Sequence, residues 1–150
     1  MTYYVGQSYT LKATTTPSAT VKWSTSNKSV ATVSTNGWVK MVKAGTTTIT
    51  AQFTYKGVTY KKTCKVTVKT PSVKLNKTTA SITKGKSVTL KATLTPSSGG
   101  TVKWTSSNKK IATVTSKGVV KGIKKGTATI TCTYTYRNKT YKKTCKVTVK

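Results

Sequence analysis

The chain has 150 residues and a formal charge of +28, because it carries 28 Lys or Arg side chains and no Asp, Glu or His. Acid and base catalysis near neutral pH uses mostly His, Glu or Asp, and calcium and zinc sites need carboxylates, imidazoles or clustered thiols. This composition excludes the usual enzyme chemistries, so we expect a non-catalytic protein with no cofactor and no metal site.

Apolar and basic residues alternate in the N-terminal quarter of the chain, where the first strands are predicted. Leu11 and Ala13 face one way and Lys12 the other, and the segment 21–23 repeats this alternation. A period of two indicates strands with one buried face. Turn signals follow at 36–37 and at Gly45. The last two strands of this half of the chain form a hairpin that turns near Lys56 and Gly57, and an equivalent hairpin turns near Arg137 and Asn138 in the second half.

The second half of the chain repeats the first. TLKATTTP at 10–17 recurs as TLKATLTP at 89–96, SNKSVATV at 26–33 recurs as SNKKIATV at 107–114, and TYKKTCKVTV at 59–68 recurs at 140–149. The offset rises from 79 to 81, which places a two-residue insertion in the loop at 97–100. About seven short strands per copy predict two tandem β-sandwiches, at 1–70 and 71–150.

The two copies differ at their N-terminal ends. Met1 aligns with Ala80, so copy one has no counterpart of residues 73–79. We therefore expect the first sandwich to lack part of its first strand, and the chain to be a segment of a longer protein with flanking domains. No apolar stretch reaches the roughly 20 residues that a membrane-spanning helix needs.

The order of these motifs carries a family resemblance. A Trp is followed by S-N, then V/I-A-T-V, then G-x-V-x-x-x-x-x-G-T-x-x-I-T, then C-K-V-T-V, and this order occurs twice. It resembles the group 2 bacterial immunoglobulin-like domain, which occurs in tandem in bacterial surface and secreted proteins such as intimin and invasin adhesins. The resemblance implies an immunoglobulin-like fold, an extracellular or cell-surface location, and a role in display, spacing or adhesion.

Three cysteines lie near the ends of the two copies. Cys132 and Cys145 fall on neighbouring strands of the last hairpin, directly opposite each other or one diagonal step apart. They either form a cross-strand disulfide or fill space in the core as two small apolar side chains. Copy one has Cys64 at the position of Cys145 but Ala51 at the position of Cys132. We expect Cys64 to be a buried free thiol.

The basic residues are distributed unevenly, with 10 in copy one and 18 in copy two. One Arg in 150 residues argues against base-specific contacts, because Arg supplies the bidentate fork that reads bases. We expect copy two to bind anionic polymers, such as a nucleic acid backbone, teichoic acid or acidic glycans, without sequence specificity. The candidate contacts are Lys84, Lys86, Lys103, Lys109, Lys110, Lys121, Lys124, Lys125, Arg137, Lys142 and Lys146.

Two other interpretations of the charge stay open. In the first, the chain is a structural spacer whose lysines keep it soluble. In the second, it is an engineered supercharged module with no natural ligand. Repulsion between like charges predicts a monomer in each case.

The Trp residues fall into two classes. Trp23 and Trp104 occupy equivalent inward positions and are predicted to belong to the cores. Trp38 has Val119 as its counterpart, and we expect it either to offer an aromatic contact to a ligand beside nearby lysines or to cover the edge left by the shortened first strand.

Overall fold

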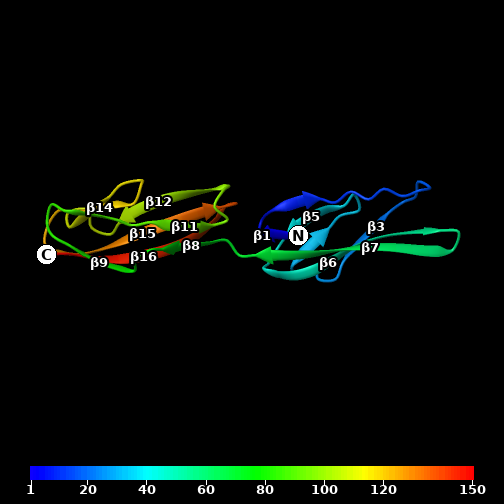
Figure 1. Cartoon of the computed structure of the whole chain (residues 1–150), viewed down its shortest axis with the longest axis horizontal. Coiled ribbons are helices and arrows are strands. Elements are labelled where there is room, and N and C mark those ends of the chain that lie inside the picture. Colours follow the sequence, from blue (N-terminus) through cyan, green and yellow to red (C-terminus); the bar gives the residue numbers. More distant parts are fainter. The chain divides into compact units, whose positions relative to one another are not determined.

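The computed structural model describes all 150 residues, and every regular element in it is a β-strand. The chain forms two compact units, Met1–Thr70 and Pro71–Lys150, called unit 1 and unit 2 below (Figure 1). Each unit has sheets in two layers, as the all-β sandwich prediction requires. The predicted fold class is confirmed.

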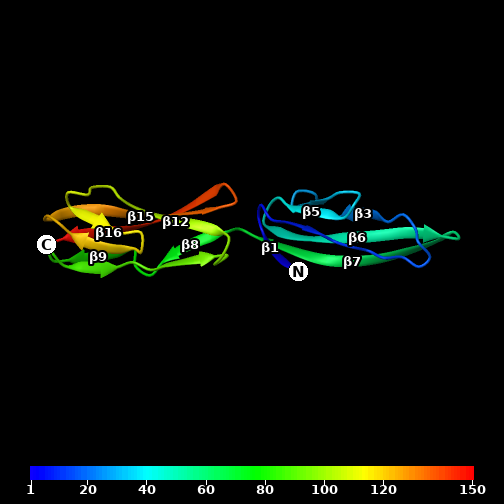
Figure 2. The same ribbon diagram turned by 90° about the horizontal axis from the view of Figure 1, so that it is seen from above.

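Unit 1 contains seven strands. β1, β7, β6 and β3 form a four-stranded sheet in that order, and β2, β5 and β4 form the second layer. In Figure 2, β5 of this second layer lies above the long β6–β7 hairpin. β1 pairs in parallel with β7, and the other pairs are antiparallel. The strands are β1 (Thr2–Tyr4), β2 (Ser8–Thr10), β3 (Lys22–Thr25), β4 (Ala31–Val33), β5 (Trp38–Met41), β6 (Gly45–Tyr55) and β7 (Val58–Lys69).

Unit 2 contains nine strands because its first and second strands are each divided in two. One layer is the sheet β12-β15-β16-β9, and the other layer combines the sheet β10-β14-β13 with the pair β11-β8. The strands are β8 (Ser72–Leu75), β9 (Thr79–Ile82), β10 (Ser87–Thr89), β11 (Ala92–Thr95), β12 (Gly100–Ser106), β13 (Ala112–Val114), β14 (Val119–Gly122), β15 (Gly126–Tyr136) and β16 (Lys139–Val149).

The long hairpins turn where the sequence predicts. Lys56 and Gly57 have φ of 46° and 78°, and Arg137 and Asn138 have φ of 48° and 63°. Positive φ at both central residues is the property of the tight two-residue turn whose twist matches paired strands. The turn fixes the register, so that Tyr136 lies opposite Lys139 and every later pair follows from it.

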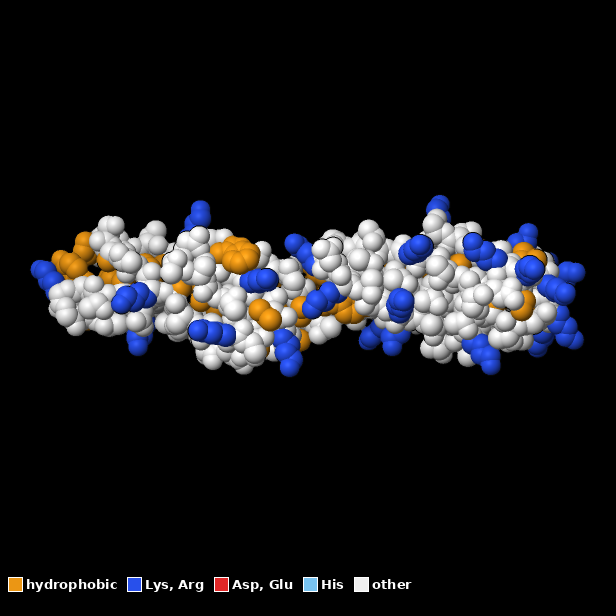
Figure 3. Space-filling view, turned by 180° about the vertical axis from the view of Figure 1, so that it is seen from behind, with side chains coloured by type: hydrophobic (Ala, Val, Ile, Leu, Met, Phe, Trp, Pro, Cys, Tyr) orange, Lys and Arg blue, Asp and Glu red, His pale blue; other side chains and the backbone are white.

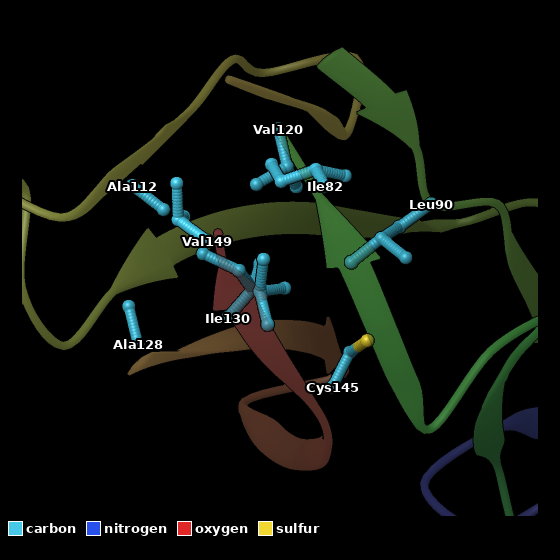
Figure 4. Packing of buried hydrophobic residues seen from close by; sticks show 9 residues of the cluster. Ile82, Leu90, Ala112, Val120, Ala128, Ile130, Cys145 and Val149 are labelled. Atoms are coloured by element: carbon cyan, nitrogen blue, oxygen red, sulfur yellow. The ribbon is translucent and has the colours of Figure 1, made fainter. Parts of the chain in front are cut away.

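Each unit has its own hydrophobic core. In unit 2 the core joins Leu90 and Val120 from one layer to Ile130 and Val149 from the other, and Figure 4 shows these side chains converging. Trp104 is partly buried and packs against this core, and Trp23 does the same in unit 1. The prediction that both are core Trp residues is confirmed.

Gly118 shows why the G-x-V motif recurs. Its φ is +80°, and its backbone carbonyl accepts a hydrogen bond of 2.9 Å from the amide of Leu90. A Cβ at this position would collide with the Leu90 carbonyl and press on the Trp104 ring. Gly37 has the same relation to Leu11 and Trp23 in unit 1, so both copies need glycine at this turn.

The structure also shows which part of the first strand unit 1 lacks. β1 pairs with β7 in the register that β9 makes with β16, so β1 is the counterpart of β9. β8 has no counterpart in unit 1. Residues 13–16, which correspond to β11, form no strand there because β11 pairs only with β8.

Candidate functional site

The predicted basic residues are all exposed, but they lie on three separate parts of unit 2. One group lies on loops at one end of the sandwich. A second group lies on the outer face of the four-stranded sheet. Arg137 lies alone at the turn between β15 and β16.

The loop group is held together by backbone hydrogen bonds between neighbouring loops. Gly122 links the β9–β10 turn to the end of β14, because its amide donates to the Lys86 carbonyl at 3.0 Å and its carbonyl accepts from Gly85 at 2.8 Å. The Lys124 amide donates to the Ile111 carbonyl at 3.3 Å, which joins the β14–β15 loop to the β12–β13 loop. These contacts gather Lys84, Lys86, Lys110, Lys124 and Lys125.

Lys150 completes this group and was not among the predicted contacts. The Lys84 amide donates a 3.0 Å hydrogen bond to the Lys150 carbonyl, so the end of β16 lies against the β9–β10 turn. We call these six lysines the basic loop cluster. In Figure 3 blue side chains gather at the right-hand end, which is the C-terminal end of unit 2. The sequence does not reveal that β9 pairs in parallel with β16, and this pairing is what brings Lys150 next to Lys84.

A second group of predicted contacts lies on the outer sheet face and its edge. Lys103 lies opposite Thr133, and Thr133 lies opposite Lys142, so the two lysines share one row across three strands. Lys146 lies opposite Thr129 and Thr79 on the same face. A surface hollow beside this sheet is lined by Lys103, Trp104, Thr105, Ser106, Lys109, Thr113 and Val114.

Lys121 and Arg137 complete the predicted set. Lys121 lies on β14, opposite Ser87 and Thr113 and next to Gly122, so it borders the basic loop cluster. Arg137 lies at the far end of β15, an 11-residue strand that begins at Gly126. At about 3.4 Å per residue the strand separates the two ends by roughly 34 Å. Arg137 therefore does not belong to the cluster.

Unit 1 has few lysines at the equivalent loop positions. Lys86, Lys110 and Lys125 correspond to Gln7, Ser29 and Ala44, and Lys84 corresponds to Val5. Only Lys28, Lys40, Lys43 and Lys69 remain at this end of unit 1, at the positions of Lys109, Lys121, Lys124 and Lys150. The same fold thus presents a dense basic surface in one unit and a sparse one in the other.

Trp38 is 44% exposed and lies on the solvent face of β5, two residues from Lys40. Met41, which faces the other way, is buried in the core of unit 1. Trp38 lines neither of the two hollows beside residues 12–15 of unit 1. Trp38 is therefore exposed and lies outside these hollows, and its contact with a ligand stays a prediction.

The cysteines are free thiols. Cys132 lies opposite Lys143, and Cys145 lies opposite Ile130, so the two thiols are diagonal neighbours on the inward face. Diagonal positions are about 7–8 Å apart, whereas the Cα atoms of a disulfide are usually about 4.4–6.8 Å apart, so this register opposes a bridge. Burial raises the pKa of both thiols. Cys64 is partly exposed, which corrects the expectation that it is buried.

The structure holds no group of three or more side chains that could bind a metal ion. It also contains no helix long and apolar enough to cross a membrane. The geometry and the charge together define an all-β, immunoglobulin-like tandem repeat in which the loops at one end of unit 2 are strongly basic.

The chain belongs to the family of bacterial Ig-like domains (group 2), whose model matches residues 1–66 and 69–147. Among curated proteins, it is similar to ice-binding protein 1 of Shewanella frigidimarina (strain NCIMB 400), with 37% identity over 121 residues, 77% of this chain and 14% of that protein. The kappa-carrageenase of Pseudoalteromonas carrageenovora is 48% identical over 62 residues, 40% of this chain and 16% of the enzyme.

The chain spans between 5% and 16% of the length of the curated relatives that it matches. Among solved structures, domains 4 and 5 of the S-layer protein SbsC are similar, with 24% identity and a TM-score of 0.46 over 87% of this chain and 70% of that one. A longer SbsC structure, rSbsC(31-844), matches with 28% identity and a TM-score of 0.49 over 87% of this chain and 20% of that one.

Proposed function

We propose that this chain is a non-catalytic, extracellular or cell-surface immunoglobulin-like module that binds anionic polymers through the basic loop cluster of unit 2. The observation that carries the proposal is the gathering of six lysines from three loops and the end of β16, in a chain with no acidic side chain to neutralise them. Family membership supports a role as one module of a larger surface or secreted protein.

The chemistry of lysine defines the mode of binding. An ammonium group contacts a phosphate, sulfate or carboxylate as a point charge, whereas base recognition relies on the planar fork of arginine. The chain has one arginine, and it lies remote from the cluster. Binding is therefore sequence-independent, driven by release of counterions from the polymer, and weakened steeply by salt.

The sheet face adds a second, weaker contact. Lys103 and Lys142 share a row on the outer face of unit 2, and Lys103 also lines the hollow beside Trp104. A flexible polymer anchored at the loops is able to continue across this face. The row is sparser than the loop cluster because threonines separate its lysines.

Retention of the whole chain on heparin and duplex DNA columns, eluted with rising salt, tests the proposal. A contiguous site predicts late elution from both columns, with equal affinity for unrelated DNA sequences. Elution at low salt from both columns would instead favour a spacer whose dispersed charge serves solubility. Strong preference for one DNA sequence would also contradict the proposed mode.

A further inference from the structure

Both units carry the same open hollow at one edge of the sandwich. In unit 2 it lies between β12 and β13, each the outermost strand of its sheet, and in unit 1 it lies between β3 and β4, which occupy the same places. The volumes are about 480 and 400 Å³, within the ~300–1,000 Å³ range of small-ligand sites. Unit 2 has its hollow with β8 and β9 both in place, so the hollow belongs to the fold of the repeat. We call these two sites the edge hollows.

The edge hollows have the same lining in the two units. A Trp and a Val form the apolar part, a Lys stands on the adjoining loop, and three Ser or Thr side chains supply hydroxyl groups. The residues are Trp104, Val114, Lys109, Thr105, Ser106 and Thr113 in unit 2, and Trp23, Val33, Lys28, Ser24, Thr25 and Thr32 in unit 1. The position after this Lys, outside the hollow, changes from Ser29 in unit 1 to Lys110 in unit 2. The chemical groups of the hollow are therefore the same although the neighbouring surface differs.

Hydrogen bonds fix the loop that carries the lysine. In unit 2 the Ser106 hydroxyl donates to the Ala112 carbonyl at 2.6 Å and accepts from the Asn108 amide at 3.2 Å. The Asn108 side chain accepts from the Lys110 amide at 3.0 Å, and the equivalent Asn of unit 1 makes the same bond at the same distance. Lys109 lies between these two bonded residues, so its backbone is held in a defined turn beside the hollow.

Other polar groups that line the hollow have no partner within the chain. The hydroxyls of Thr105 and Thr113 and the indole N–H of Trp104 form no hydrogen bond to the protein. All three reach solvent, because Thr105 is exposed and no buried polar side-chain atom lacks a partner. Trp104 is only partly exposed, since its ring packs against the core and against Gly118, so it offers a ligand only part of its ring.

These groups fit an acidic sugar better than a nucleobase. A pyranose ring has C–H groups on its faces and hydroxyls around its rim, so it packs against part of an aromatic ring while its hydroxyls pair with Ser and Thr. A nucleobase stacks on an exposed aromatic face, which Trp104 does not offer. Lys109, with Lys103 also lining the hollow in unit 2, supplies the cation for a sulfate or carboxylate on that sugar.

We propose that each edge hollow binds one acidic sugar unit of a glycan. The pyranose ring lies against the Trp, its hydroxyls pair with the Ser and Thr side chains, and its sulfate or carboxylate contacts the Lys. Unit 2 binds more tightly, because Lys103 lines its hollow in addition to Lys109. The edge hollows lie outside the basic loop cluster and occur in both units, so this inference does not rest on the proposed function. It adds a preference for glycans among anionic polymers.

The probe is a heparin tetrasaccharide, which carries both sulfate and carboxylate groups, titrated into the isotope-labelled whole chain and followed by NMR. At about 0.3 M salt the Debye length is roughly 5–6 Å, so diffuse attraction between exposed charges is largely screened. The chain has three Trp residues, and each gives its own indole N–H signal. The signals of Trp104 and, at higher probe concentration, Trp23 should shift, whereas that of Trp38, which lines neither edge hollow, should not.

Two further tetrasaccharides separate the sources of the charge. An oligogalacturonate carries carboxylates without sulfate, and cellotetraose is neutral. Binding of the oligogalacturonate as tightly as heparin would show that a carboxylate suffices, and binding of heparin alone would assign the site to sulfated sugars. Cellotetraose should bind far more weakly than the charged probes, because it has no partner for the Lys.

Matched substitutions at exposed positions test the contacts one by one. Lys109→Gln should weaken binding at the Trp104 signal about three- to five-fold, the loss of one exposed ionic contact. Lys110→Gln removes the same charge one residue away, outside the hollow, and should change the affinity little. Thr105→Val should weaken binding roughly two- to five-fold, whereas Thr101→Val, on the same face of β12, should not. Equal weakening by both lysine variants would show that only total charge matters and would overturn the proposal.

Three other results would also contradict the proposal. Equal shifts with cellotetraose would mean that charge plays no part, and no shift of the Trp104 signal at saturating probe would mean that the hollow does not take a sugar. Equal affinity of the hollow for a single-stranded oligonucleotide would assign it to polyanions in general. The variant Lys86→Gln, Lys110→Ser and Lys125→Ala separates this inference from the proposed function, because it should reduce retention on DNA and leave the Trp104 shift unchanged.

Discussion

Three lysines of the basic loop cluster can be exchanged for the residues that unit 1 carries at the same positions. The variant Lys86→Gln, Lys110→Ser and Lys125→Ala introduces side chains that this fold already accommodates as Gln7, Ser29 and Ala44. All three lysines are exposed, so the sandwich should remain intact. The change removes half of the cluster and lowers the net charge of the chain from +28 to +25.

The expected effect follows from counterion release. Each neutralised DNA phosphate contributes about 0.9 to the slope of log affinity against log salt, so six lysine contacts predict a slope of about −5 and three predict about −3. Between 50 and 200 mM salt the affinity of the original chain for duplex DNA should therefore fall roughly 2,000-fold, and that of the variant roughly 40-fold. Fluorescence anisotropy with a labelled duplex at several salt concentrations measures both slopes.

The matched control removes the same charge from other exposed positions of unit 2. Lys74→Gln, Lys91→Gln and Lys139→Gln lie on β8, between β10 and β11, and at the start of β16, outside the basic loop cluster. Its slope should stay close to that of the original chain. Equal loss of slope in both variants would refute a contiguous site and show that only total charge matters.

Further consequences concern stability and the thiols. The Thr47 hydroxyl is buried and accepts a hydrogen bond of 3.0 Å from a backbone amide in the loop after β3, so Thr47→Val should lower the free energy of unfolding of unit 1 by about 1–3 kcal/mol in urea titration. Tyr134→Phe removes the 2.7 Å hydrogen bond to the Pro96 carbonyl and should cost unit 2 about 0.5–1.5 kcal/mol in the same assay, a modest loss because unit 1 has Phe at this position. Thiol titration in denaturant should count three free thiols, and a count of one would establish the Cys132–Cys145 bridge. In the folded chain these two thiols should resist alkylation at pH 8, because burial raises their pKa and only the thiolate reacts.

Much of the fold follows from the sequence alone. The exact recurrence of TYKKTCKVTV at the two C-terminal strands and the alternation around Leu11 specify a repeated sandwich, and the family match confirms that interpretation. The hairpin turns were also predictable, since they fall between the long alternating segments. Two side-chain positions also follow from the sequence. Alternation along β5 places Met41 on the same inward face as Val39, and a two-residue turn in the β15–β16 hairpin places Cys132 opposite Lys143.

The grouping of the lysines was not predictable from the sequence. Alternation assigns Lys103, Lys142 and Lys146 to a solvent face, but it says nothing about which loops meet at the end of the sandwich. That depends on the parallel pairing of β9 with β16 and on backbone contacts such as Gly122 to Lys86. For this reason the sequence groups Arg137 with residues from which it is remote and gives no sign that Lys150 joins the cluster.

Lysine footprinting tests the central claim most directly. The whole chain is acetylated lightly with and without a short duplex at low salt, and the modified lysines are counted by mass spectrometry. The proposed site predicts strong protection of the six lysines of the basic loop cluster, with little change at lysines of unit 1; these six are Lys84, Lys86, Lys110, Lys124, Lys125 and Lys150. Protection spread evenly over both units, or none at all, would contradict it.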